Sequence, residues 1–150
     1  MKVVIQRVRH SSVTINNTIK RSIGKGLLVL FAVEVGEDNS DIDWLVGKVV
    51  NLRIFDDDQG VMNRSVLDID GEVMVVSQFT LFAKTKKGNR PSYIDSAKHE
   101  TAVPIYNEFC QRLSEALNKP VPTGEFGADM QVELLNDGPV TIIIDTKRRE

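Results

Sequence analysis

Residues 73–81 read Val-Met-Val-Val-Ser-Gln-Phe-Thr-Leu, and this stretch decides the fold. Its first four residues are apolar and mostly β-branched, which is typical of a strand covered on both faces. Ser77, Gln78 and Thr80 then put polar groups around Phe79. Because a buried polar group without a partner costs about 1–3 kcal/mol, this cluster does not stabilise a buried strand. Either the strand end emerges into solvent, or its polar groups face a pocket.

Strand and helix patterns extend outward from this stretch on both sides. Two helices are predicted, one capped by Asn39 or Ser40 and ending near Asn51, the other with helical periodicity from Ala97 to Asn118. In the second helix Pro104 fits a first turn, so regular helix is expected from near Val103. Strands are predicted at residues 2–8 with a continuation at 13–15, and at 18–23, 27–33, 53–55, 130–135 and 140–144, with an extended segment at 65–69. The mixture predicts one α+β domain over residues 1–150.

Composition narrows the class of protein. The chain has 150 residues, enough for one domain with its own core, and no apolar run approaches the roughly 20 residues of a membrane span. Cys110 is the only cysteine, so no intrachain disulfide is possible and a cytoplasmic location is expected. With only His10 and His99 beside it, a His/Cys zinc site is not expected, and neither is any other metal or cofactor.

Positive charge gathers in two stretches, the tail Lys147-Arg148-Arg149 and one loop, although the formal net charge is −2. That balance argues against a uniformly basic nucleic-acid-binding surface. A local patch is still possible in the loop after residue 81. Its basic residues, which are either solvated surface or a binding patch, are Lys84, Lys86, Lys87 and Arg90.

A second informative stretch, residues 136–141, reads Asn-Asp-Gly-Pro-Val-Thr. Its composition predicts a tight turn. A trans bond before Pro139 is the ordinary outcome, since about 5–6% of X-Pro bonds are cis. A cis bond would give a rigid turn that presents backbone carbonyl groups in fixed directions and so discriminates ligands by geometry.

These stretches occur together with several others, in an order that resembles one known family. The resembling fragments are residues 4–8, 24–29, 50–55, 62–63, 77–81, 87–92, 126–130 and 136–141. Each fragment alone is weak evidence for a family, but the occurrence of all of them in this order across almost the whole chain is specific evidence. The chain resembles the D-aminoacyl-tRNA deacylases, once called D-tyrosyl-tRNA deacylases. The region around His10 and the tail Lys147–Glu150 depart from the family pattern.

The resemblance implies a fold, an activity and an assembly. The fold would be a curved, barrel-like sheet core with two main helices. The reaction would be hydrolysis of the ester that joins a D-amino acid to the 3′-terminal adenosine of tRNA. The protein would be a homodimer in which a cis Gly138-Pro139 turn of one subunit enters the active site of the other. There its carbonyl groups would meet the substrate amino group and leave no space for an L side chain. Glycine has no side chain to reject, so glycyl-tRNA would also fit.

Catalytic and binding roles follow for particular residues. Backbone N–H groups of Phe79 and Thr80 are expected to stabilise the oxyanion, while Ser77 and Gln78 position the terminal adenosine or the attacking water. Thr80 is either a nucleophile or a pocket wall. The second reading is favoured, because no general base is visible nearby in the sequence.

Three further expectations concern the surroundings of the site. Met130 and Phe126 are either pocket walls or core residues. The loop from Lys84 to Arg90 is expected to contact tRNA phosphates. Rival functions are a tRNA-end binding module without hydrolysis, a small-molecule esterase or D-amino-acid peptide hydrolase, and a purely structural dimer.

Overall fold

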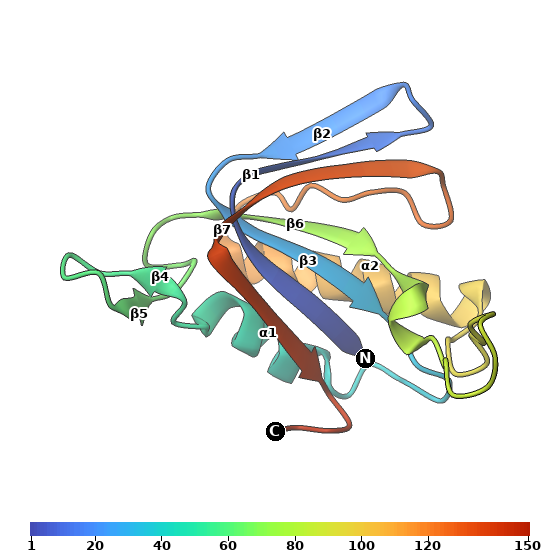
Figure 1. The fold of residues 1–150 in the computed structure, drawn as a ribbon. Helices are drawn as coiled ribbons and strands as arrows, with labels where there is room; N and C mark the ends of the chain where they lie inside the picture. The colour runs from blue at the N-terminus through green and yellow to red at the C-terminus, as the bar shows by residue number, and fades with distance from the viewer.

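Two long bent strands form the frame of the molecule. The computed structural model describes residues 1–150. Strand β1 (Lys2–Ile15) pairs antiparallel with β7 (Met130–Asp145) from one end to the other, with register shifts on either side of Val8. Both strands bend near these irregularities, so the sheet curls back on itself (Figure 1).

The remaining strands line up on these two. Strand β2 (Ile19–Ile23) pairs with the second half of β1, and β3 (Gly26–Ala32) pairs with the first half. Strand β6 (Glu72–Ser77) lies parallel to β3, in the order β2-β1-β3-β6. This curled sheet with two helices confirms the predicted α+β fold with a curved core.

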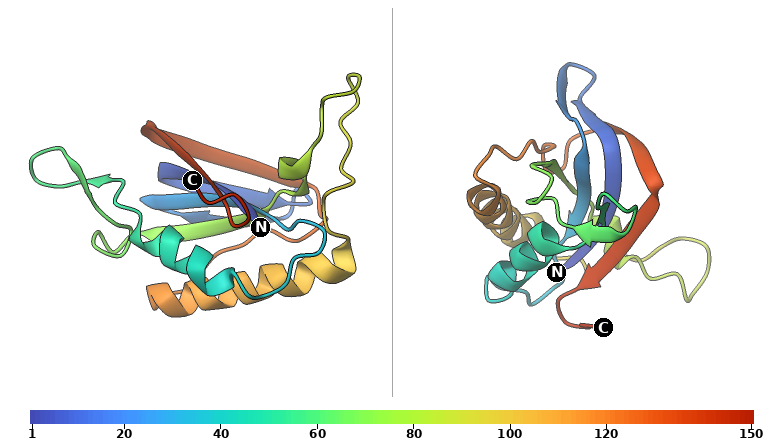
Figure 2. Two further views of the ribbon diagram at one scale, coloured as in Figure 1. Left: turned by 90° about the horizontal axis from the view of Figure 1, so that it is seen from below. Right: turned by 90° about the vertical axis from the view of Figure 1, so that its left-hand side faces the viewer.

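Both faces of β3 and β6 are covered, as the apolar run predicted. Alternate residues such as Val29 and Val75 face the helices α1 (Ile42–Asn51) and α2 (His99–Leu117), which lie side by side beneath the sheet (Figure 2). The residues between them, such as Leu28 and Met74, pack against the folded-over half of the sheet. The curl therefore creates two hydrophobic clusters, one on each face of the central strands.

Four local predictions were wrong. Residues 65–69 are not extended: after the short hairpin β4 (Phe55–Asp56) and β5 (Met62–Arg64), the chain forms successive turns, and the Asp68 carboxylate accepts the Ser65 N–H. The first helix begins after Asp41, without a side-chain cap from Asn39 or Ser40. The third and fourth errors concern Pro104 and residues 136–139.

Pro104 lies inside α2, one turn beyond the predicted position, because the helix begins at His99. A proline there leaves the Glu100 carbonyl without its helical donor, and the exposed side of the helix allows water to replace it. Residues 136–139 do not form a hairpin turn. They belong to β7, which stays paired to β1 on both sides of them.

Neither helix is long and apolar enough to cross a membrane.

Candidate functional site

The polar end of β6 opens into a groove. Ser77 is the last strand residue, and the Gln78 N–H donates the final ladder bond to the Phe31 carbonyl at 2.7 Å. The chain then turns into η1, a short 3₁₀ helix at Phe79–Phe82. Of the two interpretations of this strand end, the pocket holds for Ser77 and Gln78, which line a groove of about 350 Å³, whereas Thr80 does not line it. The groove is lined by residues 76–79 on one side and by residues 126–130 and 132 on the other.

Side chains in the predicted catalytic stretch contact one another. The Gln78 side-chain amide donates to the Thr80 hydroxyl, and the Ser96 hydroxyl donates to the Phe79 carbonyl at 2.8 Å. The Phe79 ring is half exposed and stands edge-on to Tyr93, with ring centroids 5.0 Å apart. These contacts therefore hold residues 78–80 on the side away from the groove, while Gln78 and Phe79 line the groove on their other side.

The first two N–H groups of η1 have no acceptor in the chain. Phe79 and Thr80 begin this helix, where N–H groups lack intrahelical partners, and neither makes a backbone or side-chain hydrogen bond as donor. These are the groups that the sequence assigned to an oxyanion.

The opposite wall of the groove comes from a segment that the sequence analysis treated mainly as a loop. Met130 and Phe126 both line the groove and also pack against the two hydrophobic clusters, so each is wall and core together. The segment is attached to β6 by two hydrogen bonds: the Val75 N–H donates to the Pro122 carbonyl, and the Gly124 N–H donates to the Val75 carbonyl. The remaining wall residues are Gly127, Ala128, Asp129 and Val132, and Val132 alone lies outside the resembling fragment 126–130.

The Gly138-Pro139 bond is cis, as the resemblance implied. The Asn136 side chain accepts the Val140 N–H at 2.9 Å and closes this bulge of β7. Arg7, a buried residue that the sequence analysis did not identify, supports it from below: its Nε donates to the Asp137 carbonyl at 2.8 Å. Gly138 and Pro139 themselves are exposed.

Within one chain, residues 77–81 and residues 136–141 do not lie together. Asn136 lies opposite Val8, which lies opposite Gly26, which in turn lies opposite Glu72 at the start of β6. Ser77 is five residues further along that strand, about 16 Å away at 3.3 Å per residue. Figure 1 shows the bend of β7 at one end of the sheet and η1, in yellow-green, at the other.

The basic loop projects from the η1 end of the molecule (Figure 2). Lys84 is partly neutralised by an ion pair with Asp95 at 2.7 Å. Lys86, Lys87 and Arg90 are exposed and have no ion-pair partner. These three cations are therefore free to contact a ligand.

Cys110 does not resemble a nucleophile. Burial raises the pKa of its thiol to about 12, and the same burial raises the pKa of neighbouring Tyr106 well above its ordinary value. The Tyr106 hydroxyl instead donates to the Val75 carbonyl beneath the groove. No group of three His, Cys, Asp or Glu side chains is arranged to hold a metal ion.

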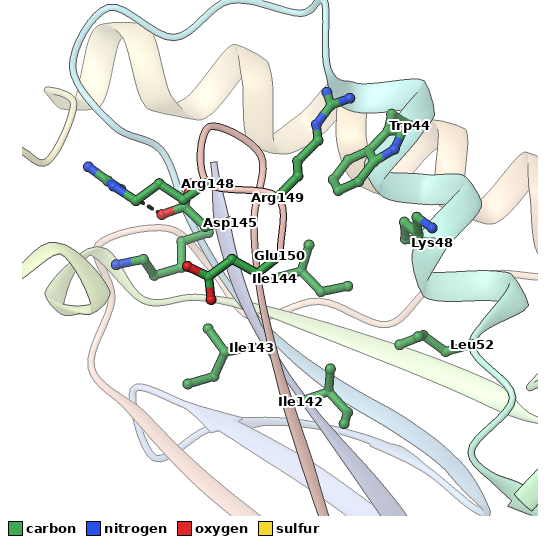
Figure 3. A pocket seen from close by; sticks show the side chains of 11 residues that line it. Trp44, Lys48, Leu52, Ile142, Ile143, Ile144, Asp145, Arg148, Arg149 and Glu150 are labelled. Atoms are coloured by element: carbon green, nitrogen blue, oxygen red, sulfur yellow. Dashed lines mark hydrogen bonds and ion pairs between the residues drawn. The ribbon is translucent and has the colours of Figure 1, made fainter.

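A larger hollow of about 790 Å³ lies between α1 and the C-terminal half of β7 (Figure 3). Its cations are already engaged: Arg149 lies over the Trp44 ring and pairs with Asp41, while Arg148 pairs with Asp145. Isoleucines of β7 form its floor. None of the predicted site residues lines it, so we assign it no role in the site.

A third hollow, of about 370 Å³, shares Phe126 with the groove. It lies between α2 and the 123–126 segment, and we call it the α2 pocket. It is lined by Arg21, His99, Val103, Tyr106, Asn107, Thr123, Gly124, Glu125 and Phe126.

Comparisons with known proteins agree with the resemblance. Residues 4–145 match the family described as D-Tyr-tRNA(Tyr) deacylase. The chain is 62% identical to a D-aminoacyl-tRNA deacylase of Bacteroides thetaiotaomicron and 59% identical to one of Flavobacterium psychrophilum, in each case over the full length of both chains.

Solved structures share the fold. A c-Myc DNA unwinding element binding protein superposes with a TM-score of 0.90 at 38% identity, covering 97% of this chain and 98% of the other. A probable eukaryotic D-amino acid tRNA deacylase superposes with a TM-score of 0.81 at 18% identity, covering 95% and 97% of the two chains. The second likeness bears on the fold alone.

Proposed function

The chain belongs to the D-Tyr-tRNA(Tyr) deacylase family and is an ester hydrolase that acts on D-aminoacyl-tRNA, and we propose that it cleaves the ester in the groove at the end of β6. The observation that carries this assignment is the run from Ser77 to Thr80. It leaves the sheet at the groove and begins η1 with two N–H groups that lack acceptors. As an ester hydrolase, the protein is neither a binding module nor a purely structural dimer.

The proposed chemistry is attack by water on the ester carbonyl. The water oxygen bonds to the carbonyl carbon, the C–O bond to the tRNA breaks, and the tRNA hydroxyl leaves with a proton. Because negative charge develops on the carbonyl oxygen, the free N–H groups of Phe79 and Thr80 are suitable donors to it. The groove holds the terminal adenosine, with Ser77 and Gln78 on one side and Met130 on the other.

Thr80 contributes through its backbone and not as a nucleophile. Its hydroxyl accepts a hydrogen bond from the neutral Gln78 amide and contacts no histidine or carboxylate that could take its proton. The tRNA 2′-hydroxyl, which lies next to the ester, is then the nearest group of the substrate able to orient the water.

Selection against L substrates is proposed to come from a second copy of the chain. The exposed Gly138-Pro139 bulge lies about 16 Å along the sheet from the groove of its own chain, so it can line a groove only in a partner. In a homodimer its carbonyl groups would meet the substrate amino group and its backbone would occupy the space that an L side chain needs. Glycyl-tRNA would pass the same filter.

Contacts to tRNA phosphates are proposed for the exposed cations of the loop that follows η1. Lys86, Lys87 and Arg90 are free of acidic partners and project from the end of the molecule that carries the groove. Lys84 contributes less, because Asp95 already holds it. A cytoplasmic location remains a prediction from the single cysteine.

The decisive experiment is paired deacylation of D-tyrosyl-tRNA and L-tyrosyl-tRNA by the purified protein. Release of D-tyrosine with L-tyrosyl-tRNA spared would support both the reaction and the chiral filter. Cleavage of both would retain the hydrolase and refute the Gly138-Pro139 filter. Binding of tRNA without cleavage of either would refute the assignment of the groove as a hydrolytic site.

A further inference from the structure

We propose that the α2 pocket binds the base of the nucleotide that precedes the terminal adenosine of the tRNA. This inference rests on the proposed function, because it takes the groove as the adenosine site. The groove and the α2 pocket share the Phe126 ring as a wall. Two sites that share one aromatic ring can take two consecutive nucleotides, whose bases are splayed apart around it.

The walls of the α2 pocket are held at a fixed distance from the groove. The Arg21 guanidinium donates to the Thr123 carbonyl at 2.6 Å, and the Gly124 N–H donates to the Val75 carbonyl at 3.2 Å. Phe126 is therefore carried on a segment tied to both β2 and β6. A ligand that enters both sites gains from this preorganisation, because no loop has to be ordered on binding.

One stripe of α2 supplies the opposite side of the pocket. His99, Val103 and Asn107 are four residues apart, so their side chains share one helix face. The His99 ring stands edge-on to Phe126, at 84° with centroids 5.2 Å apart. The edge-on arrangement of the His99 and Phe126 rings leaves a ring face on which a base can stack.

The free polar groups of the pocket match a cytosine. Neither the His99 nor the Asn107 side chain has a hydrogen-bond partner in the chain, whereas the Tyr106 hydroxyl is occupied by the Val75 carbonyl. The Asn107 amide can donate to a base acceptor, and the Glu125 carboxylate can accept from an exocyclic amine. Cytosine carries both kinds of group, and the tRNA acceptor end reads CCA.

The test compares two minimal substrates that differ only by this nucleotide. One is adenosine esterified with D-tyrosine at its 3′-hydroxyl, and the other is the cytidylyl-adenosine dinucleotide with the same ester. We expect the wild-type kcat/KM to be about fivefold or more higher for the dinucleotide, as one base–aromatic stack supplies. His99→Ala and Asn107→Ala should remove most of this gain, mainly through KM, and leave cleavage of the adenosine ester unchanged.

Gln111→Ala is the matched control. It removes an amide from the next turn of α2, outside the pocket, where the side chain bonds only Glu115. It should leave both substrates unaffected. An equal loss on both substrates in the His99 and Asn107 variants would overturn the inference, since the residues would then act only by supporting Phe126. Equal wild-type activity on the two substrates would also overturn it. A wild-type protein that cleaves neither substrate nor D-tyrosyl-tRNA would instead refute the proposed function itself.

Discussion

Gly138 has a backbone φ of +132°, a conformation that residues with a side chain rarely adopt. A Cβ built there would lie 2.8 Å from the Arg7 Nη2 and 3.0 Å from a Val140 methyl group. Both the backbone and the surroundings therefore require glycine.

Gly138→Ala should lower the free energy of unfolding by about 1–3 kcal/mol and abolish cleavage of D-tyrosyl-tRNA, because the displaced carbonyl groups no longer meet the substrate amino group. Urea denaturation and paired deacylation measure the two effects. Gly47→Ala is the control, because nothing lies within 4 Å of its Cβ position in α1, and it should stabilise by about 0.5–1 kcal/mol. If Gly138→Ala is as stable and active as the wild type, the proposed role of this bulge is wrong.

The Thr80 hydroxyl accepts a hydrogen bond from Gln78 and has no general base beside it. Thr80→Val keeps the shape of the side chain and removes the hydroxyl. We therefore expect the variant to retain most of the turnover of D-tyrosyl-tRNA in a single-turnover assay. A collapse in rate with unchanged folding and tRNA binding would show that the hydroxyl takes part in the chemistry.

The Cys110 thiol should be inert in the folded protein. Desolvation raises its pKa to about 12, so the thiolate is scarce at pH 8. Labelling with iodoacetamide at pH 8 should be slow in buffer and fast in urea. Because the folded pKa lies above the ordinary value of 9.0, the contribution of the neutral thiol to stability is present below pH 9 and is lost as the pH rises toward 12. Rapid labelling in buffer would contradict this.

At the scale of elements, the junction of β6 and η1 shows how the end of a strand provides unpaired N–H groups for a binding site. Strand β6 is buried while it pairs with β3, and its last ladder bond is made at Gln78. Beyond that point no neighbouring strand accepts hydrogen bonds from the chain. The chain therefore enters η1 with backbone N–H donors that have no partner. The loop that follows carries the free cations and projects from the η1 end of the molecule (Figure 2).

Replacing Lys86, Lys87 and Arg90 together by glutamine should weaken tRNA binding and reduce its salt dependence. If all three contact phosphates of a single strand, the slope of log K against log salt should fall by about two. Lys84→Gln serves as the control and should change the slope less, because Asp95 already pairs with Lys84. Binding titrations at several salt concentrations give the slopes. An unchanged slope in the triple variant would refute phosphate contact by this loop.

At the scale of the whole molecule, the separation of the bulge from the groove requires two chains for one site. The prediction is tested by mixing two inactive variants. Gly138→Ala damages the bulge, and Val132→Trp fills the groove with a ring at an exposed position of β7. A mixed dimer then contains one site in which both parts are intact.

Coexpression of the two variants should restore about a quarter of wild-type activity, since half of randomly formed dimers are mixed and each has one good site of two. Each variant alone should be inactive on D-tyrosyl-tRNA. Sedimentation of the wild type should show a dimer. A monomer, or a mixed dimer with no activity, would refute completion of the site by a partner.

The sequence by itself determined the elements with strong periodic patterns and the stretches that carry chemistry. The apolar run before Ser77 predicted a strand covered on both faces, and the polar residues after it predicted the pocket as one of two outcomes, because burial and hydrogen bonding limit such residues to few environments. The α+β class followed in the same way. The cis bond before Pro139 came only from the resemblance, since local statistics favour trans.

Only the tertiary structure decided which distant segments meet. Phe126 and Met130 face Ser77 across the groove because the sheet curls at the shared bend of β1 and β7, and no local pattern encodes that curl. Pairing with β1 likewise kept residues 136–139 within a strand where their composition favoured a turn, and packing of α2 extended the helix ahead of Pro104. For residues 136–139 the free energy of strand pairing exceeded a local preference of about 1 kcal/mol per residue or less. For α2 the free energy of helix packing exceeded the roughly 3 kcal/mol that an interior proline costs.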